Sequence, residues 1–234
     1  MKKLLIIIVI LSYEMSLKAQ STSTIDNTSP MEASIAVRTL STNNFKANDL
    51  EYEDIRGTPY LEKEFLTGYL VMIDKNRSDE VSLQYDIYSG DFLYLNNKEE
   101  ELTIDLKHVR SVVMQGGEEN YLFKRLDPRT PHKFYEILYE SDAFDLYNDI
   151  QINFYEGKEQ GITKIDPRFA RDDNYYILRK GEERQKIKLK KKDIFKLFSK
   201  EEQKEMNNIV KDNNIKLKKS KDFKQLFLAM KTEN

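Results

Sequence analysis

Residues 81–88 read Val-Ser-Leu-Gln-Tyr-Asp-Ile-Tyr, and this stretch indicates the type of fold. Apolar side chains occupy every second position, with Ser82, Gln84 and Asp86 between them. Successive side chains of a β-strand point to opposite faces of the sheet. The alternation therefore predicts a strand with one buried face and one face in water.

Seven further short apolar runs flank this strand, at residues 65–73, 92–95, 102–106, 109–114, 121–126, 134–139 and 150–155. The links between the runs contain turn-forming residues, as in 74–79 and 89–91. Strands joined by such short links are antiparallel, because a parallel return needs a crossover of about a dozen residues or more. We therefore expect an antiparallel β-meander of about eight strands, as a curved open sheet or a partial barrel.

The C-terminal part of the chain changes its periodicity. Residues 175–189 read as a β-hairpin with a turn at Lys180-Gly181. Apolar residues then recur at helical spacing in three groups, Ile194/Leu197/Phe198, Met206/Ile209/Val210 and Phe223/Leu226/Phe227/Met230. Ser199-Lys200-Glu201-Glu202 has the pattern of a capping box, which predicts a helix start. The expected fold class is α+β, with the meander followed by a β-hairpin and a small C-terminal helical region.

The pattern Ile-Lys-Leu-Lys-Lys occurs twice, at residues 187–191 and 215–219, and each copy precedes an apolar helix. It reads either as a duplicated strand-plus-helix unit or as chance similarity in Lys-rich sequence. Two copies are fewer than the three or more of a repeat array, so the sequence leaves both interpretations open.

The N-terminus has the pattern of a secretory signal peptide. Lys2 and Lys3 precede an apolar run over residues 4–11, and Ala19/Gln20 is a candidate cleavage point, although Leu17 stands where a small residue is preferred. The run is too short to span a membrane, which takes about 20 apolar residues. We expect an exported protein that is periplasmic, outer-membrane-associated or secreted, with no transmembrane segment after cleavage.

Four regions are expected along the chain. Residues 1–19 are the signal peptide, 20–50 a flexible leader rich in Ser, Thr, Asn and Asp, 51–172 an antiparallel β-sheet domain, and 173–234 a hairpin plus Lys-rich helical region. Gly and Pro one residue apart, within 56–61, mark the entrance to the ordered part.

The composition excludes several kinds of chemistry. Because the chain has no cysteine, it has no disulfides, thiolate metal sites or Cys nucleophiles. Its two histidines, His108 and His132, lack the spacing of zinc ligands. Asp74 and Asn76 alternate as in a calcium loop, but Asp79 stands where an EF-hand requires glycine, so a hairpin turn is favoured.

One acidic cluster, Glu140, Asp142, Asp145 and Asp149, has the residue types of a glycoside hydrolase pair. Since 40 of 234 residues are Asp or Glu, a solvated sheet edge is the favoured explanation of the cluster. The chain contains no nucleophile elbow, Walker loop or dinucleotide-binding glycine motif. We expect a non-enzyme without cofactor or metal, and an envelope hydrolase is the least favoured alternative.

Charge is distributed unevenly between the two parts of the chain. Residues 179–234 contain eighteen Lys or Arg and nine Asp or Glu, whereas residues 20–178 contain seventeen and thirty. This asymmetry favours docking of the two parts on each other, a basic face for an anionic partner, or a solvated surface. The candidate basic surface consists of Lys186, Lys188, Lys190, Lys191, Lys192, Lys216, Lys218 and Lys219.

The expected partner of the basic surface is an envelope protein, an anionic lipid or a glycan. Nucleic acid is not expected, because the protein is read as exported and its net charge is negative.

A candidate aromatic platform for sugars or peptides consists of Tyr88, Tyr94, Tyr135 and Tyr139. Cross-strand packing is the favoured explanation of these tyrosines.

Three stretches carry a resemblance to known sequences: Gly-Thr-Pro-Tyr-Leu at 57–61, Leu-Gln-Tyr-Asp-Ile-Tyr at 83–88, and Tyr-Tyr-Ile at 175–177 with the Lys-rich helices after it. Together they resemble a family of uncharacterised exported proteins from Gram-negative envelopes, over about residues 55–232. The resemblance implies a location in the cell envelope and a domain organisation, but no activity. We expect a non-enzymatic envelope binding or scaffold protein, and the alternative is a periplasmic carrier of an apolar, lipid-like ligand inside the curled sheet.

Overall fold

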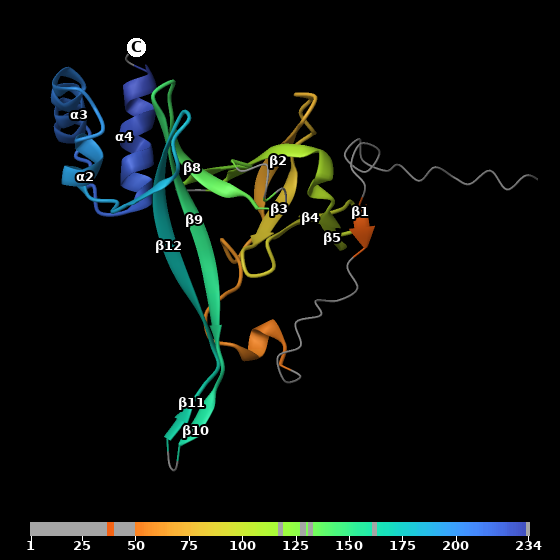
Figure 1. Ribbon diagram of the computed structural model, residues 1–234. Coiled ribbons are helices and arrows are strands. Elements are labelled where there is room, and N and C mark those ends of the chain that lie inside the picture. Colours follow the sequence, from red (N-terminus) through yellow and green to blue (C-terminus); the bar gives the residue numbers. More distant parts are fainter. Residues whose placement is uncertain are drawn as a thin grey trace, which may run out of the picture.

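The computed structural model describes residues 37–39, 50–116, 119–126, 130, 133–160 and 163–232, so the expected signal peptide lies outside it. Over these residues the protein is α+β, with one open eleven-stranded antiparallel sheet, a separate two-stranded sheet and three α-helices near the C-terminus (Figure 1). The α+β class and the antiparallel sheet are confirmed. The sheet is open, which is one of the two expected forms, and its eleven strands are the eight of the expected meander region, the two of the expected hairpin and the additional strand β1.

The eleven-stranded sheet has the order β1-β5-β4-β3-β2-β6-β7-β8-β9-β12-β13. Its strands are β1 (Val37–Thr39), β2 (Leu66–Met72), β3 (Val81–Asp86), β4 (Asp91–Leu95), β5 (Glu101–Ile104), β6 (Val109–Gln115), β7 (Asn120–Lys124), β8 (Tyr135–Glu140), β9 (Phe144–Tyr155), β12 (Arg168–Arg179) and β13 (Gln185–Ile187). The smaller sheet pairs β10 (Lys158–Gln160) with β11 (Thr163–Ile165). The helices are η1 (Tyr52–Asp54), η2 (Leu106–His108), α2 (Lys191–Phe195), α3 (Lys200–Asp212) and α4 (Ser220–Thr232).

The sheet departs from a simple meander between β5 and β6. These successive strands do not pair with each other; the short helix η2 connects them, and β6 pairs with the free side of β2. The strand β2 pairs with β3 over Leu66–Gly68 and with β6 over Thr67–Met72. After β5 the chain runs back past the four strands β2–β5 and adds β6 on the other side of β2. This return gives this part of the sheet its curl.

A long hairpin forms the spine of the molecule. The strands β9 and β12 have twelve residues each and pair over their full length, and β10 and β11 continue the hairpin away from the body (Figure 1). The expected domain boundary at residues 172 and 173 lies inside β12, which runs through it without a break. The strand β1 lies within the expected leader and pairs with the edge strand β5.

In the described part of the chain, three hydrophobic clusters contact the spine: two large cores, and a small cluster of Tyr135, Ile137 and Tyr147. The strand core lies in the curl of β2–β7, and its least exposed side chains include Leu83, Phe92 and Phe123, which are 0–1 % exposed. The helix core packs α2, α3 and α4 against β8, β9 and β12 through side chains that include Leu146 and Phe223.

The helical pattern of the sequence matches the helix core. The capping box is confirmed, because Ser199 Oγ accepts from Glu202 N and a Glu202 carboxylate oxygen accepts from Ser199 N. Met206 and Ile209 of α3 are buried, as their spacing predicts. The two Ile-Lys-Leu-Lys-Lys segments both direct Ile and Leu into this core, although only the first contributes residues to a strand.

Strand β9 connects the two cores. Phe144 and Leu146 belong to the helix core, and Ile150 belongs to the strand core. Between them, Asn148 is fully buried and donates hydrogen bonds to carboxylates of β8 and β12. The boundary between the cores is therefore polar, which matters for the candidate sites.

Candidate functional site

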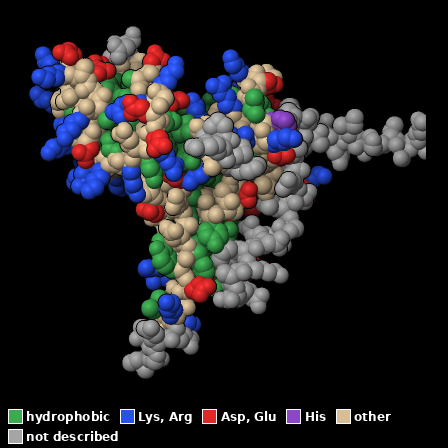
Figure 2. All heavy atoms as spheres, viewed as in Figure 1, with side chains coloured by type: hydrophobic (Ala, Val, Ile, Leu, Met, Phe, Trp, Pro, Cys, Tyr) green, Lys and Arg blue, Asp and Glu red, His purple; other side chains and the backbone are tan. Residues whose placement is uncertain are grey.

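All eight lysines of the candidate basic surface are exposed. Lys188 follows the half-buried Ile187, and Lys216 and Lys218 flank the buried Leu217, so the alternation that fills the helix core also turns these lysines outward. Figure 2 shows Lys and Arg side chains along the outer side of the helical region. The structure thus places Lys186 on β13 and the other seven lysines on the segments before α2 and before α4 and on the start of α2.

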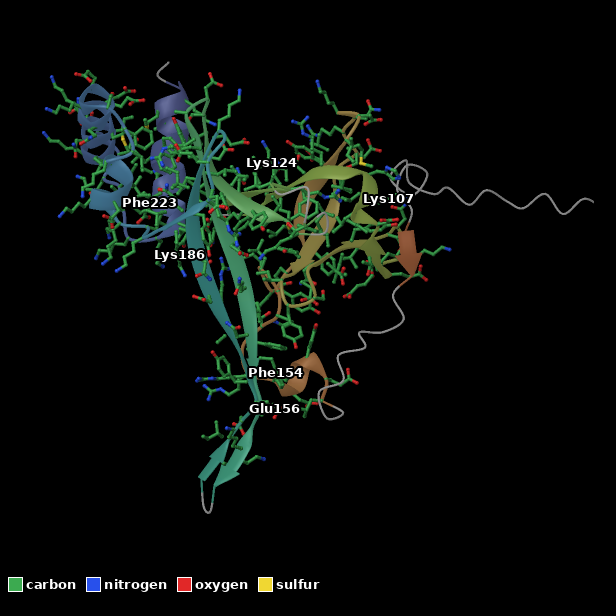
Figure 3. All side chains as sticks on the ribbon, viewed as in Figure 1. Lys107, Lys124, Phe154, Glu156, Lys186 and Phe223 are labelled. Carbon is green, nitrogen blue, oxygen red and sulfur yellow. The ribbon has the colours of Figure 1, made fainter. Side chains whose placement is uncertain are left out.

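The eight lysines have few interactions with the rest of the protein. Lys186, labelled in Figure 3 near the junction of the helical region and the spine, donates a hydrogen bond to Asn174 Oδ1. Lys191 Nζ lies 4.9 Å from the Phe195 ring centroid. Within the described part of the chain, none of the eight forms an ion pair with a carboxylate.

The four tyrosines of the candidate aromatic platform do not share a surface. Tyr94 and Tyr135 are 1 % and 3 % exposed, in different hydrophobic clusters, because cross-strand packing buries them. Tyr139 packs on Phe227 at a centroid distance of 4.8 Å, so it belongs to the edge of the helix core. Tyr88 is 38 % exposed. The structure therefore does not bring these four residues together as a platform.

The acidic cluster comes together only in part, because Glu140 and Asp145 are cross-strand neighbours and Asp149 lies further along β9. Glu140 accepts two 2.6 Å hydrogen bonds from Lys124 Nζ and lies opposite Asp145 across the β8–β9 pairing. Burial, with the Glu140 charge beside it, raises the pKa of Asp145. Asp149 lies further along β9, where it is 2 % exposed and forms a 2.7 Å ion pair with Lys133.

The remaining candidates for metal binding have structural explanations. Asp74 accepts hydrogen bonds from the backbone and side-chain nitrogens of Asn76, which closes the β2–β3 turn. His108 is exposed at the end of η2, and His132 lies outside the described residues. Among the described residues, no group of three or more His, Asp or Glu side chains has an arrangement that could hold a metal ion.

A charged seam lies between the two cores, and no local pattern in the sequence marks its residues as a group. It consists of Glu62, Glu119, Tyr121, Glu136, Asn148, Arg171, Asp173 and Lys224. Lys224 lies at its centre: its Nζ is 2.6 Å from Glu119 Oε1, forms a second ion pair with Glu136, and donates to the Asn120 carbonyl oxygen at 3.1 Å. The same ammonium lies 4.4 Å from the Tyr121 ring centroid.

Hydrogen bonds extend the seam in both directions from Lys224. Tyr121 donates to Glu62 Oε1 at 2.6 Å. Asn148 Nδ2 donates to Glu136 at 3.1 Å and to Asp173 at 2.8 Å, and Arg171 forms a fork of bonds to that same Asp173 carboxylate. The acidic part of the chain is therefore docked on the basic part at Lys224, as one interpretation of the charge asymmetry predicts.

Burial and nearby seam charges shift the titration of two tyrosines, Tyr121 within the seam and Tyr175 beside it. Burial raises the pKa of Tyr121 above its usual value, and the hydrogen bond to Glu62 and the nearby carboxylates act in the same direction. Burial and the Asp173 charge raise the pKa of Tyr175, on the adjacent β12, to about 12. Both phenols are therefore neutral at physiological pH.

A groove of about 830 Å³ lies beside the seam, between α4 and the strands β6, β7 and β8. Its apolar lining includes Val113, Leu122, Ile137, Phe227 and Leu228. Leu228 is 65 % exposed, although its neighbour Phe227 is buried in the helix core. Three lysines of α4 also line the groove, so it combines an apolar floor with positive charge.

Sequence reasoning found the eight exposed lysines but missed the groove and the seam. The signal for the groove was Leu228, an apolar residue next to the Phe223/Leu226/Phe227/Met230 core stripe of α4. No such signal marked the seam, because Glu119, Glu136 and Lys224 look like ordinary surface charges in a chain that is one-third charged.

No protein-family model matches this chain, and comparison with curated proteins and with solved structures found no match. The resemblance to exported envelope proteins therefore stays a prediction. Among the described residues, no helix has the length and apolar character needed to cross a bilayer.

Proposed function

We propose that the protein is an exported, non-enzymatic binding protein of the cell envelope that holds an anionic lipid surface against its lysine-rich helical region. The observation that carries this proposal is the exposure of all eight lysines without a carboxylate partner in the described part of the chain. Clusters of four to eight basic residues bind anionic lipid surfaces, with about 1 kcal/mol from each residue near the surface.

Lipid is favoured over the other anionic partners because of the side chains involved. Every one of the eight cations is a lysine, a flexible point charge that adapts to mobile headgroups. Recognition of one fixed carboxylate or phosphate geometry more often uses the planar fork of arginine. The envelope address rests on the signal-peptide pattern at residues 1–19 and is part of the proposal.

Vesicle cosedimentation tests this proposal. The mature chain is expected to bind vesicles that contain phosphatidylglycerol and not to bind vesicles of pure phosphatidylcholine. Binding should weaken as the salt concentration rises, because the charges become screened. The variant Lys188→Gln/Lys190→Gln/Lys216→Gln/Lys218→Gln should bind anionic vesicles at least about tenfold more weakly. The matched control removes four exposed lysines of the strand region, Lys63, Lys75, Lys98 and Lys107, by the same substitution.

Equal losses in the two variants would overturn the proposal, because binding would then follow net charge rather than the helical surface. Retention on an anionic polysaccharide but not on vesicles would overturn the lipid assignment and make the partner a glycan.

The carrier alternative requires space for an apolar ligand. The interior of the curl is filled by the strand core, in which Leu83, Phe92 and Tyr94 are at most 1 % exposed. The space that remains for an apolar ligand there is a pocket of about 610 Å³ at the edge of the strand core, with Tyr85, Phe134 and Ile150 in its lining. The groove beside α4 is the better location for such a ligand.

A further inference from the structure

We infer that the groove between α4 and the strands β6–β8 binds a single-chain anionic amphiphile of the fatty-acid class. The apolar chain lies against Leu228 and Phe227, and the anionic group meets Lys231. This inference does not depend on the proposed membrane contact, because none of the eight lysines of the basic surface lines the groove.

Helix α4, which forms one wall of the groove, exposes an apolar side chain there. Four groove residues share one face of α4, because they are spaced three, four and three residues apart: Lys221, Lys224, Leu228 and Lys231. The opposite stripe of α4 is buried in the helix core. Leu228, at 65 % exposed, is the apolar member of an otherwise cationic face, which is the pattern expected where an apolar ligand completes the packing.

The size and lining of the groove also indicate a ligand site. A volume of about 830 Å³ is that of a small-molecule site, for which about 300–1,000 Å³ is typical. The sheet supplies Val113, Leu122 and Ile137 as an apolar floor, on three neighbouring strands. An acyl chain placed there buries apolar surface of its own and of Leu228, at about 25 cal/mol per Å².

The position of charge along the groove indicates where the anionic group lies. At the N-terminal half of α4 the charges are matched, because Lys224 pairs with Glu119 and Glu136, and Asp222 accepts from the backbone nitrogens of Lys218 and Lys219. At the other end Lys231 is exposed, with its Nζ 5.8 Å from the Tyr139 ring centroid and no carboxylate partner among the described residues. An anionic group is therefore placed at Lys231 rather than at Lys221.

The absence of tryptophan from the chain allows a site-specific test. The variant Leu228→Trp places a single fluorophore in the groove, and Ile73→Trp places one at another exposed apolar position, which is 58 % exposed and lies outside the groove. Titration with oleate below its micelle concentration is expected to give a saturable blue shift for Leu228→Trp and none for Ile73→Trp. Native mass spectrometry of the unsubstituted protein with oleate should show one bound molecule.

Charge substitutions then test the orientation of the ligand. In the Leu228→Trp background, Lys231→Gln is expected to weaken oleate binding at least about fivefold, since a charge-assisted contact is lost. Lys211→Gln, the same charge change at an exposed position of α3 outside the groove, should leave it within about twofold. Oleyl alcohol, which has the same chain without the charge, should bind as weakly as oleate binds the Lys231→Gln variant.

Several outcomes would overturn the inference. They are equal shifts at positions 73 and 228, no bound oleate in the unsubstituted protein, equal losses from Lys211→Gln and Lys231→Gln, or equally tight binding of the alcohol. None of these outcomes bears on vesicle binding by the eight-lysine surface, so the two proposals fail separately.

Discussion

Replacement of Lys224 by methionine is expected to destabilise the protein by about 3 kcal/mol. The substitution keeps the apolar stem of the side chain but removes the ammonium that pairs with Glu119 and Glu136. Glu136 is 1 % exposed, so its charge is left buried without its cation. Loss of one partner of a buried ion pair costs about 3–5 kcal/mol, and the lower end applies because the Lys224 side chain keeps 15 % exposure.

Urea denaturation followed by circular dichroism measures this loss. The control is Lys231→Met on the same helix, which should change the free energy of unfolding by less than about 0.5 kcal/mol because its ammonium is exposed. A double-mutant cycle with Glu136→Gln should give a coupling energy above about 1 kcal/mol, since the two residues are in direct contact. A loss below about 1 kcal/mol for Lys224→Met, or no coupling in the cycle, would refute the reasoning.

Three further predictions concern the capping box, a close strand contact and alkaline pH. Ser199→Ala should lower the free energy of unfolding by about 1 kcal/mol, whereas Ser199→Asp should preserve it because aspartate also caps helices; equal losses in thermal denaturation would contradict this. Gly68→Ala should cost about 1–3 kcal/mol or more, since an added Cβ would lie 2.3 Å from the Val113 carbonyl oxygen. Gly90→Ala, where nothing lies within 4 Å but φ is +82°, should cost only about 1–2 kcal/mol, and urea titrations compare the two. Finally, the raised pKa of Tyr175, about 12 in the folded protein, stabilises the fold fully below the unfolded value of about 10, and this contribution is lost as the pH rises through 12. Urea midpoints at pH 9 to 12 should therefore fall less steeply for Tyr175→Phe, and an unchanged slope would contradict the assignment.

The sequence predicted those features that local patterns encode. Alternation over residues 81–88 marks β3 because one face of that strand is buried, and the Ser199/Glu202 pair marks the start of α3 because both side chains bond to nearby backbone. Each of the eight apolar runs and both strands of the later hairpin overlaps a strand in the structure. Exposure of the eight lysines also followed from local alternation with Ile and Leu.

Features that depend on distant partners were not predictable in this way. The pairing of β6 with β2 is set by tertiary packing, and the first half of β12, with Arg171, Asp172 and Asp173 in succession, has no apolar alternation to mark a strand. The burial of Tyr94 and Tyr135 agrees with the cross-strand packing favoured from the sequence, but the clusters that bury them are formed by distant strands. The charged seam joins residues from opposite ends of the chain, so its burial is visible only in the folded protein.

The course of β9 past both cores has a consequence for the order in which this protein can acquire its structure. The strand core needs Ile150, and β9 in turn is held by β12, which ends at Arg179. A chain that emerges from a ribosome or a translocation channel with its N-terminus first therefore completes the strand core, with its support from β12, only when about three-quarters of it has appeared. The strand core then forms late and cooperatively. Truncated chains that stop before residue 150 are expected to remain protease-sensitive.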